Sequence, residues 1–380
     1  MKPAEKKRRR RWIIILIVTV LVIVLAAAGF YIYTKLRVYT GYEVLSSYDL
    51  NYSTENISVR EFANGYVECS SGGITYFTKN GPVWSESFEM NMPLMDICEG
   101  YIAVADMKQS DVYLFDKSGP AGRVTSSHAI TDVEVSRAGV TAVITDNGSS
   151  SFIEIRDREG NELINIKNNF SSSGYPMDIA LSSDGTKLAA AFLYVSQGSF
   201  GSKVLFYDFS EGRGSDNALI KTFDQYTDTV LTDIEFMGGS TLCAVGDDAL
   251  TFYRLTGSDP QIISEELNMD WEVQSLLITN EYLLFITKSS SDEANYTARI
   301  YNTSGEAVTD INFDLPYSNA CIAGKHLMIY SASAAQMFDF DSRLKFSHSF
   351  SERTEYMYPS GGYPSYILVT GGDTQFIALK

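Results

Sequence analysis

The longest unbroken apolar segment of the chain runs from Trp12 to Tyr33 and contains no charged residue. As an α-helix rising about 1.5 Å per residue it would be about 33 Å long, enough to cross a hydrocarbon core about 30 Å thick. The basic residues Lys6–Arg11 precede it, and positive charge beside a membrane helix marks its cytoplasmic end. We therefore predict a basic cytoplasmic tail over residues 1–11, one transmembrane helix (a signal anchor) over 12–34 and a short linker over 35–41.

This interpretation describes a single-pass protein of the cell membrane whose residues 42–380 form an extracytoplasmic domain. The alternative is a secretory signal that is cleaved near Ala26–Ala28. The apolar core of such a signal usually has about 7 to 15 residues. The longer run here favours a retained anchor, and whether the anchor is ever cleaved stays open.

After residue 38 the continuous apolar run gives way to short segments in which apolar and polar residues alternate. Period-2 alternation rich in Val, Ile, Tyr and Phe is typical of β-strands. The strands recur as a unit with an apolar first strand, a Gly-containing turn, a second strand, a third strand ending in Phe/Tyr-Asp, and a fourth strand. Successive units begin at Asp96, Asp132, Asp178, Asp233, Ser275 and Asn319.

The 36 to 55 residues between these starts fit the four-stranded blades of a β-propeller. A further unit near residues 56–90 brings the number of visible blades to seven. The C-terminal strands 365–369 and 375–379, together with an early strand around 42–50, would form a composite eighth blade. We predict an all-β propeller of eight blades, with seven as the alternative, closed by pairing of its N- and C-terminal strands so that no edge stays free.

The charge of the chain is divided unevenly. Residues 1–37 carry nine Lys/Arg and one Glu, a balance of +8, so the overall −17 leaves −25 on the rest. Such an acidic domain repels nucleic acid and is compatible with basic partners, cations or neutral glycans, although the charge can equally serve solubility alone. We expect no nucleic-acid partner, and the oligomeric state stays open.

The sequence contains none of the common catalytic, metal-binding or nucleotide-binding motifs. The three histidines lack zinc-ligand spacing, and there is no nucleophile elbow, P-loop or dinucleotide fingerprint. Cys69, Cys98, Cys243 and Cys321 sit in apolar strand-like runs and are expected to be buried, unpaired thiols. A Cys69–Cys98 disulfide stays open in an external compartment. We therefore expect no enzyme, no catalytic residues, no cofactor and no metal.

Two short motifs resemble known propellers. Residues 182–189, Ser-Ser-Asp-Gly-Thr-Lys-Leu-Ala, resemble the S-P-D-G-x-x-L-A hairpin of WD40-like and TolB-like propellers, and Asn80–Trp84 resembles the Gly-x-x-Trp element of quinoprotein-like ones. The whole layout is similar to an uncharacterised family of single-pass propeller proteins of Gram-positive bacteria, domain of unknown function 5711. The shared motifs include Tyr48–Leu50, Gly174–Pro176 and Val245–Asp247. The resemblance implies a location and a fold, and no activity.

One repeated feature predicts a binding site. Asp96, Asp132, Asp178 and Asp233 occupy the same point of four consecutive units. If each opens an innermost strand, the carboxylates gather at one mouth of the central channel. Three tyrosines of Pro-containing loops are expected at the same opening: Tyr175, Tyr317 and Tyr363. Aromatic rings beside carboxylates suit a cation, an amine or a sugar face. The competing interpretation is structural, with each Asp accepting backbone N–H bonds that fix the repeat.

Three classes of function follow. The first is a membrane-tethered binding or scaffold module in the cell envelope, with a protein or glycan partner. The second is an extracellular sensor that binds a small ligand or Ca²⁺ in the channel, although the cytoplasmic part of about eleven residues is short for a signalling output. The third is an envelope enzyme acting on polysaccharide, which no motif supports.

Overall fold

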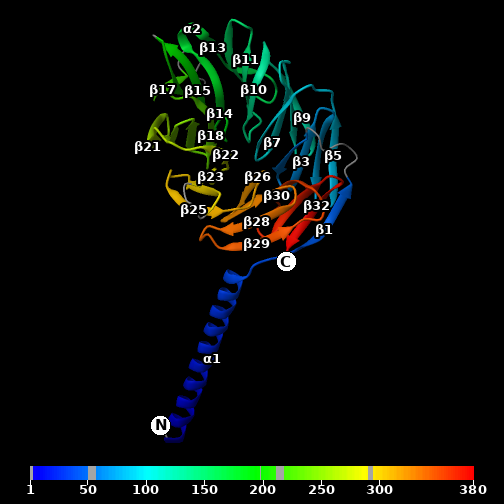
Figure 1. Ribbon diagram of the computed structural model, residues 1–380, viewed down its shortest axis with the longest axis vertical. Coiled ribbons are helices and arrows are strands. Elements are labelled where there is room, and N and C mark those ends of the chain that lie inside the picture. Colours follow the sequence, from blue (N-terminus) through cyan, green and yellow to red (C-terminus); the bar gives the residue numbers. More distant parts are fainter. Residues whose placement is uncertain (1–2, 50–56, 197, 211–217, 290–293) are drawn as a thin grey trace.

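The computed structural model describes residues 3–49, 57–196, 198–210, 218–289 and 294–380. Across these residues the chain forms eight four-stranded antiparallel sheets arranged as the blades of a ring, with helix α1 (Pro3–Leu36) projecting from it (Figure 1). The prediction of an eight-bladed all-β propeller is confirmed, and the seven-bladed alternative is wrong. A second helix, α2 (Phe170–Ser173), is a single short turn.

Within blades one to seven, consecutive strands pair in order, so that the first strand of each blade is innermost. Blades one to four consist of β2 (Ser58–Phe62), β3 (Gly65–Ser70), β4 (Gly73–Thr78), β5 (Gly81–Ser87); β6 (Pro93–Cys98), β7 (Tyr101–Asp106), β8 (Asp111–Asp116), β9 (Gly119–Thr125); β10 (Ala129–Val135), β11 (Thr141–Asp146), β12 (Ser150–Arg156), β13 (Glu162–Asn169); and β14 (Tyr175–Leu181), β15 (Lys187–Ser196), β16 (Ser199–Asp208), β17 (Leu219–Thr227). Blades five to seven consist of β18 (Leu231–Met237), β19 (Thr241–Gly246), β20 (Ala249–Thr256), β21 (Asp259–Leu267); β22 (Val273–Ile278), β23 (Tyr282–Lys288), β24 (Tyr296–Asn302), β25 (Ala307–Phe313); and β26 (Asn319–Ala323), β27 (His326–Tyr330), β28 (Ala334–Asp339), β29 (Leu344–Ser349).

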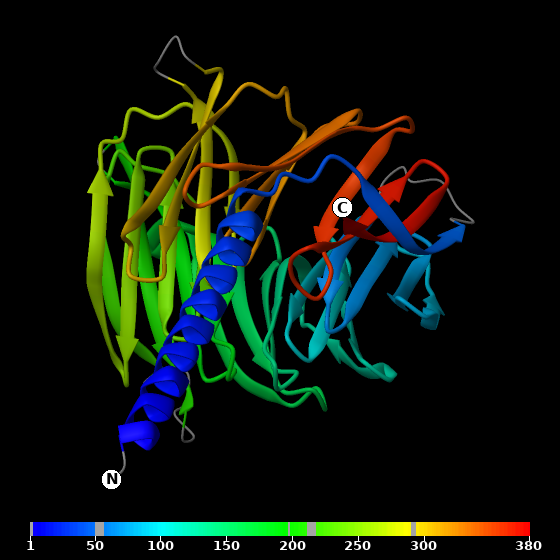
Figure 2. The ribbon, with the colours of Figure 1, turned by 90° about the horizontal axis from the view of Figure 1, so that it is seen from below.

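Blade eight joins the two ends of the chain. Its order is β1 (Tyr42–Asp49), β32 (Asp373–Leu379), β31 (Ser365–Thr370) and β30 (Thr354–Pro359), with β1 outermost and antiparallel to β32. Figure 2 shows blue β1 lying beside the red C-terminal strands. Closure by the terminal strands is therefore confirmed. The blade takes three C-terminal strands rather than the predicted two, because β30 was not among the predicted strands.

The hydrophobic core is divided among the seams between blades. In the described residues there are eight buried clusters, and each combines side chains of two neighbouring blades, the last joining blade eight to blade one through residues such as Tyr66 and Phe376. Neighbouring blades are thus held together mainly by their packed apolar faces, because burial of apolar area is the dominant favourable term in the free energy of folding.

The linker between α1 and β1 lies against blade seven. Lys35 forms an ion pair with Asp341 (3.3 Å), the Tyr39 N–H donates to the Lys345 carbonyl (2.8 Å), and the Ser347 N–H donates to the Tyr39 carbonyl (3.1 Å). Residues 37–41 therefore connect the helix firmly to the ring. Counting only the described residues of the chain, no helix is both long and apolar enough to cross a membrane.

Removal of β1 is expected to open the ring. A chain beginning at residue 57 would leave β32 as an unpaired edge and expose apolar surface of blade eight, which promotes edge-to-edge association. We expect this chain to unfold at lower temperature and to self-associate, as measured by thermal unfolding and by size-exclusion chromatography with light scattering. A chain beginning at residue 38 keeps β1 and serves as the control. Equal melting temperatures and equal masses for the two chains would contradict the closing role of β1.

Candidate functional site

The four repeated aspartates lie on the innermost strands of blades two to five: Asp96 on β6, Asp132 on β10, Asp178 on β14 and Asp233 on β18. On β10, β14 and β18 the register with the second strand shifts just before the Asp. Such a β-bulge inserts one extra residue and re-aims the side chain that follows. The aspartates therefore lie within the strands, inside the ring, rather than at the strand starts as predicted.

Three of these carboxylates fasten one blade to the next. The Val135 N–H of blade three donates to Asp96 Oδ2 (2.7 Å), and the Ile234 N–H of blade five donates to Asp178 Oδ2 (2.7 Å). Asp132 likewise accepts a hydrogen bond from the Ile179 backbone of blade four. This geometry matches the structural interpretation of the repeat, since a carboxylate on one inner strand satisfies a backbone donor of its neighbour.

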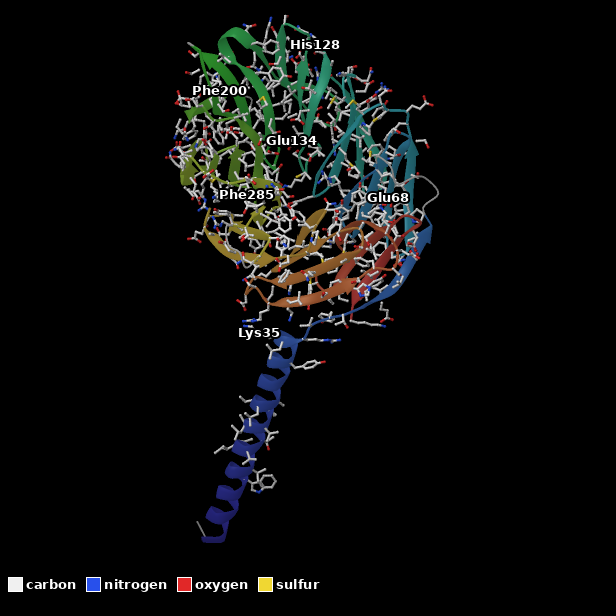
Figure 3. The ribbon with its side chains drawn as sticks, viewed as in Figure 1. Lys35, Glu68, His128, Glu134, Phe200 and Phe285 are labelled. Atoms are coloured by element: carbon white, nitrogen blue, oxygen red, sulfur yellow. The ribbon has the colours of Figure 1, made fainter. Side chains whose placement is uncertain are left out.

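Two glutamates that the sequence analysis missed join the aspartates. Glu134 on β10 and Glu235 on β18 follow Asp132 and Asp233 by two residues, so the period of a strand places them on the same side. The repeated Asp-x-Glu spacing was the signal that could have revealed them. Figure 3 shows Glu134 on the inner side of the ring.

Four of these six carboxylates line two cavities along the channel, which share three of them. One of about 430 Å³ is bordered by Arg60, Asp96, Asp132, Glu134 and Glu235. The other, of about 500 Å³, shares Asp96, Glu134 and Glu235 and opens between the turns that follow the inner strands. Arg137 and Asp184 lie at that opening, in the turns of blades three and four. Water reaches the carboxylates through the channel, since none of them is fully buried.

Crowding of the acidic groups favours their protonated forms. Burial, followed by the charges of Asp96 and Asp178, raises the pKa of Glu235 to about 8. Burial likewise raises the pKa of Asp96 to about 6, despite the hydrogen bond from Val135. The pKa of Asp178 is raised by burial and then by the charge of Asp132. Ionisation of each further carboxylate is unfavourable beside the others, and a nearby positive charge would stabilise the ionised forms.

The three predicted tyrosines do not share one mouth. Tyr175 opens β14 and Tyr317 precedes β26, at the face where inner strands begin, and the Tyr317 hydroxyl hydrogen-bonds with Ser275 Oγ (2.8 Å). Tyr363 lies in the turn between β30 and β31, at the opposite face, where its ring stacks on His326 with centroids 4.1 Å apart. Its placement beside the other two tyrosines was wrong, because β30 had not been recognised as the inner strand of its blade.

The cysteines and a possible metal site can be assessed within the described residues. All four cysteines are free, so the open alternative of a Cys69–Cys98 disulfide is wrong and unpaired thiols are confirmed. Cys98 is partly exposed, whereas the other three are buried. In the part of the chain that the structure describes, no three His, Cys, Asp or Glu side chains are arranged to hold a metal ion.

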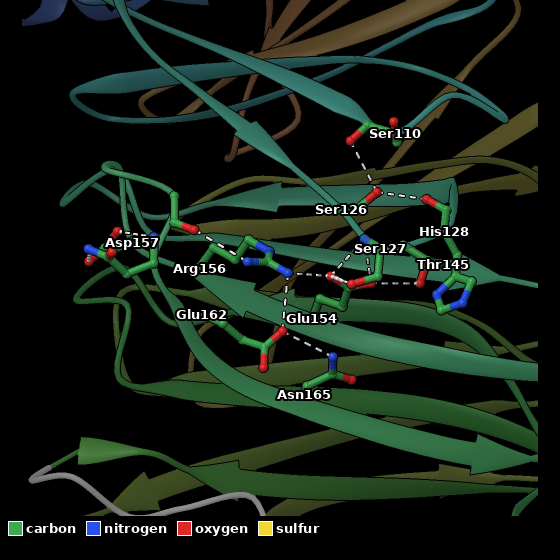
Figure 4. Close-up of polar contacts among 12 residues, drawn as sticks. Ser110, Ser126, Ser127, His128, Thr145, Glu154, Arg156, Asp157, Glu162 and Asn165 are labelled. Carbon is green, nitrogen blue, oxygen red and sulfur yellow. Dashed lines mark hydrogen bonds and ion pairs between the residues drawn. The ribbon is translucent and has the colours of Figure 1, made fainter.

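A separate polar network at the seam of blades two and three is structural. Glu154 is fully buried and accepts hydrogen bonds from the Ser127 N–H (3.0 Å), Thr145 Oγ1 (3.2 Å) and Arg156 Nη2 (3.0 Å), as Figure 4 shows. Arg156 also reaches Glu162 (3.1 Å). A buried carboxylate needs this number of donors to offset its lost hydration. The network ties the β9–β10 crossover to β12.

Comparison with known proteins gives the family. The family of unknown function DUF5711 matches residues 35–379. The chain belongs to this family. The match covers the linker and the entire propeller and confirms that part of the resemblance seen in the sequence. No curated protein matches the chain significantly.

Solved structures similar to this DUF5711 member are also propellers. BamB from Moraxella catarrhalis has a TM-score of 0.51 at 11% identity, covering 89% of this chain and 100% of BamB. Sqt1 from Chaetomium thermophilum, bound to the N-terminus of ribosomal protein L10, has a TM-score of 0.51 at 9% identity, covering 85% and 92%. KlAtg21 in complex with the coiled coil of AgAtg16 has a TM-score of 0.52 at 12% identity, covering 76% and 94%. At such identities the likeness shows the fold alone.

Replacement of Glu235 by Gln is expected to flatten the dependence of stability on pH. Because the pKa of Glu235 is raised to about 8, the folded protein binds more protons than the unfolded chain between roughly pH 4 and pH 8, and stability falls as pH rises through that window. Glu235→Gln should therefore raise the melting temperature at pH 9 and leave it nearly unchanged at pH 4. Glu89→Gln, at an exposed position, is the control. A similar pH profile for Glu235→Gln and the native protein would count against the crowded channel.

The role of Asp178 as an acceptor can be separated from its charge. Asp178→Ala leaves the backbone N–H of buried Ile234 without its partner, at a cost of about 1–3 kcal/mol in unfolding free energy. Asp233→Ala is the matched control, because within the described part of the chain Asp233 accepts no hydrogen bond from blade six. Chemical denaturation of both variants measures the difference. Equal losses would show that the bond to Ile234 is not what holds these blades together.

Proposed function

We propose that this protein is a membrane-tethered, extracytoplasmic propeller that binds a protein or glycan partner in the cell envelope and catalyses no reaction. The observation that carries the proposal is the combination of a closed ring with the uncharged run from Trp12 to Tyr33, which the linker joins to blade seven. A ring without free edges presents two faces of turns and loops, which is a surface for recognition. The helix would tether this surface to the membrane.

The tether is supported by the character of α1. No other described part of the protein covers its large apolar side chains, whose exposed fractions are, for example, 56% for Ile15, 55% for Leu21 and 62% for Leu25. Where the exposed side chains of a helical segment are apolar on every side, rather than along one stripe, that segment needs an apolar environment around it. The uncharged run from Trp12 to Tyr33 and the preceding Lys6–Arg11 support a single span with the N-terminus in the cytoplasm. A single-pass layout in Gram-positive bacteria would agree with the family resemblance.

The binding role is supported by the fold and by charge. Propellers are typical of binding and scaffold modules, and two of the similar structures are complexes, one with the N-terminus of L10 and one with the coiled coil of AgAtg16. In the present chain, the acidic channel opening beside Asp184 would attract basic segments of a partner and repel nucleic acid.

A sensor is the second candidate. The two cavities of about 430 and 500 Å³ are large enough for a small cationic ligand. Against Ca²⁺ stands the lack, within the described residues, of any group of acidic side chains arranged around one ion. The cytoplasmic tail of about eleven residues also offers little to carry a signal. We therefore place binding of a macromolecular partner first.

Fractionation and crosslinking of the tagged full-length protein test the proposal. We expect the protein to stay in the membrane pellet after alkaline carbonate extraction, and in-cell crosslinking to capture a reproducible envelope partner. Val18→Arg combined with Val22→Arg should release the protein, since each charge in a membrane helix costs about 2.5–3.5 kcal/mol on insertion scales.

Val18→Leu combined with Val22→Leu is the matched control and should remain in the pellet. Extraction of the native protein by carbonate would refute the tether. Repeated crosslinking without a captured macromolecule, from a protein that does stay in the membrane, would instead favour the sensor over the scaffold.

A further inference from the structure

A polar groove of about 340 Å³ lies on blade six, at the face opposite the opening of the acidic channel. It is bordered by the segment before β22, the end of β23, the start of β24 and the end of β25. The side chains that matter for its chemistry are Trp271, Glu272, Lys288, Arg299, Asp310 and Asn312. Its volume falls in the range of small-ligand sites.

The charges in this groove largely cancel. Arg299 donates from Nε and Nη2 to the two carboxylate oxygens of Asp310 (2.8 and 2.9 Å). Lys288 Nζ pairs with Glu272 Oε2 (2.6 Å). Of the other lining residues only Asp270 is charged. A charged ligand would have to compete with these pairs, whereas a neutral ligand that offers many hydroxyl groups would not.

The guanidinium of Arg299 and the indole of Trp271 are held in place by their neighbours. The Arg299 guanidinium lies 4.9 Å from the centroid of the Trp271 ring. The Trp271 ring in turn packs edge-on against Phe285 at 5.5 Å, a residue labelled in Figure 3. Bidentate pairing and ring contacts reduce the freedom of these side chains before any ligand arrives, and such preorganisation lowers the entropic cost of binding.

Hydrogen-bonding capacity remains in the groove. Asn312 accepts from Thr297 Oγ1 (2.8 Å) through its carbonyl oxygen, which fixes the amide plane and keeps the N–H₂ group as a donor. Each Asp310 oxygen bound by Arg299 has a second lone pair with which to accept. Donors and acceptors fixed side by side, next to an indole, match the neighbouring hydroxyls and the apolar C–H face of a sugar ring.

We propose that the groove beside Trp271 binds a neutral oligosaccharide. The inference rests on the proposed function for its setting in the envelope, and the topology agrees with that setting. The groove is formed where inner strands begin, whereas the linker contacts Asp341 and Tyr363 at the face where inner strands end. In a tethered protein the groove therefore lies on the face opposite the linker.

The test uses the full chain in micelles of a detergent that has no sugar head group. The neutral probes are maltotetraose and the β-1,4-linked tetramer of N-acetylglucosamine, and the charged probes are the fully deacetylated tetramer and tetragalacturonate. Saturation-transfer NMR and calorimetry measure binding. We expect a neutral tetramer to bind, and Trp271→Ala and Asn312→Ala each to weaken it by about tenfold or more. Asn312 is exposed, so its removal leaves the fold intact.

Arg123→Met is the matched control. Arg123 also pairs with an aspartate, Asp111, and lies over an aromatic ring, that of Tyr113 at 5.3 Å, but on blade two. Its replacement should leave binding unchanged. The proposal is overturned if neither neutral tetramer binds at about 10 mM, if a charged tetramer binds more tightly, or if Arg123→Met weakens binding as much as Asn312→Ala. Because the measurement is made in micelles, it is independent of whether the fractionation experiment supports the tether.

Discussion

The antiparallel pairing of β1 with β32 is the constraint on which the rest of this structure depends. It runs from Tyr42 opposite Leu379 to Asp49 opposite Asp373 and completes a blade from the two ends of the propeller. Each apolar cluster lies between two blades. A ring missing one blade would therefore expose the apolar faces of both neighbouring blades. Closure therefore distributes stability around the whole circle, and it removes the free edges that would otherwise invite aggregation.

Closure also creates the acidic channel. Eight inner strands converge on one axis, and side chains that are far apart in sequence become neighbours there. Asp96, Asp132 and Asp178 connect neighbouring blades there, since each accepts a hydrogen bond from a backbone N–H of the following blade. Glu134 and Glu235 have no such partner among the described residues, and their pKa values are raised by burial and by the nearby carboxylates. One part of the acidic cluster thus connects neighbouring blades, whereas the two glutamates keep their protons to a higher pH than isolated glutamates do.

The two faces of the ring differ in what they offer a partner. The face where inner strands end carries the acidic opening, and the linker contacts the ring at the same face. The opposite face carries Tyr175, Tyr317 and the groove with Trp271 and paired charges. A propeller can use both faces at once, because the rigid blades between them keep the two surfaces at a fixed separation.

The sequence alone determined the class of fold and the closing strand β1, and it favoured eight blades over seven. Strand alternation and the repeat are local patterns that can be recognised without tertiary information. It also revealed the Asp repeat and the unpaired thiols. Only the tertiary structure decided which side chains meet. Tyr363 and Tyr175 have the same Gly-Tyr-Pro context, yet they lie on opposite faces, because one precedes an inner strand and the other follows one. The pairing of Arg299 with Asp310 and its stacking on Trp271 depends on the register of three strands, and a register is set by the packing of the entire blade.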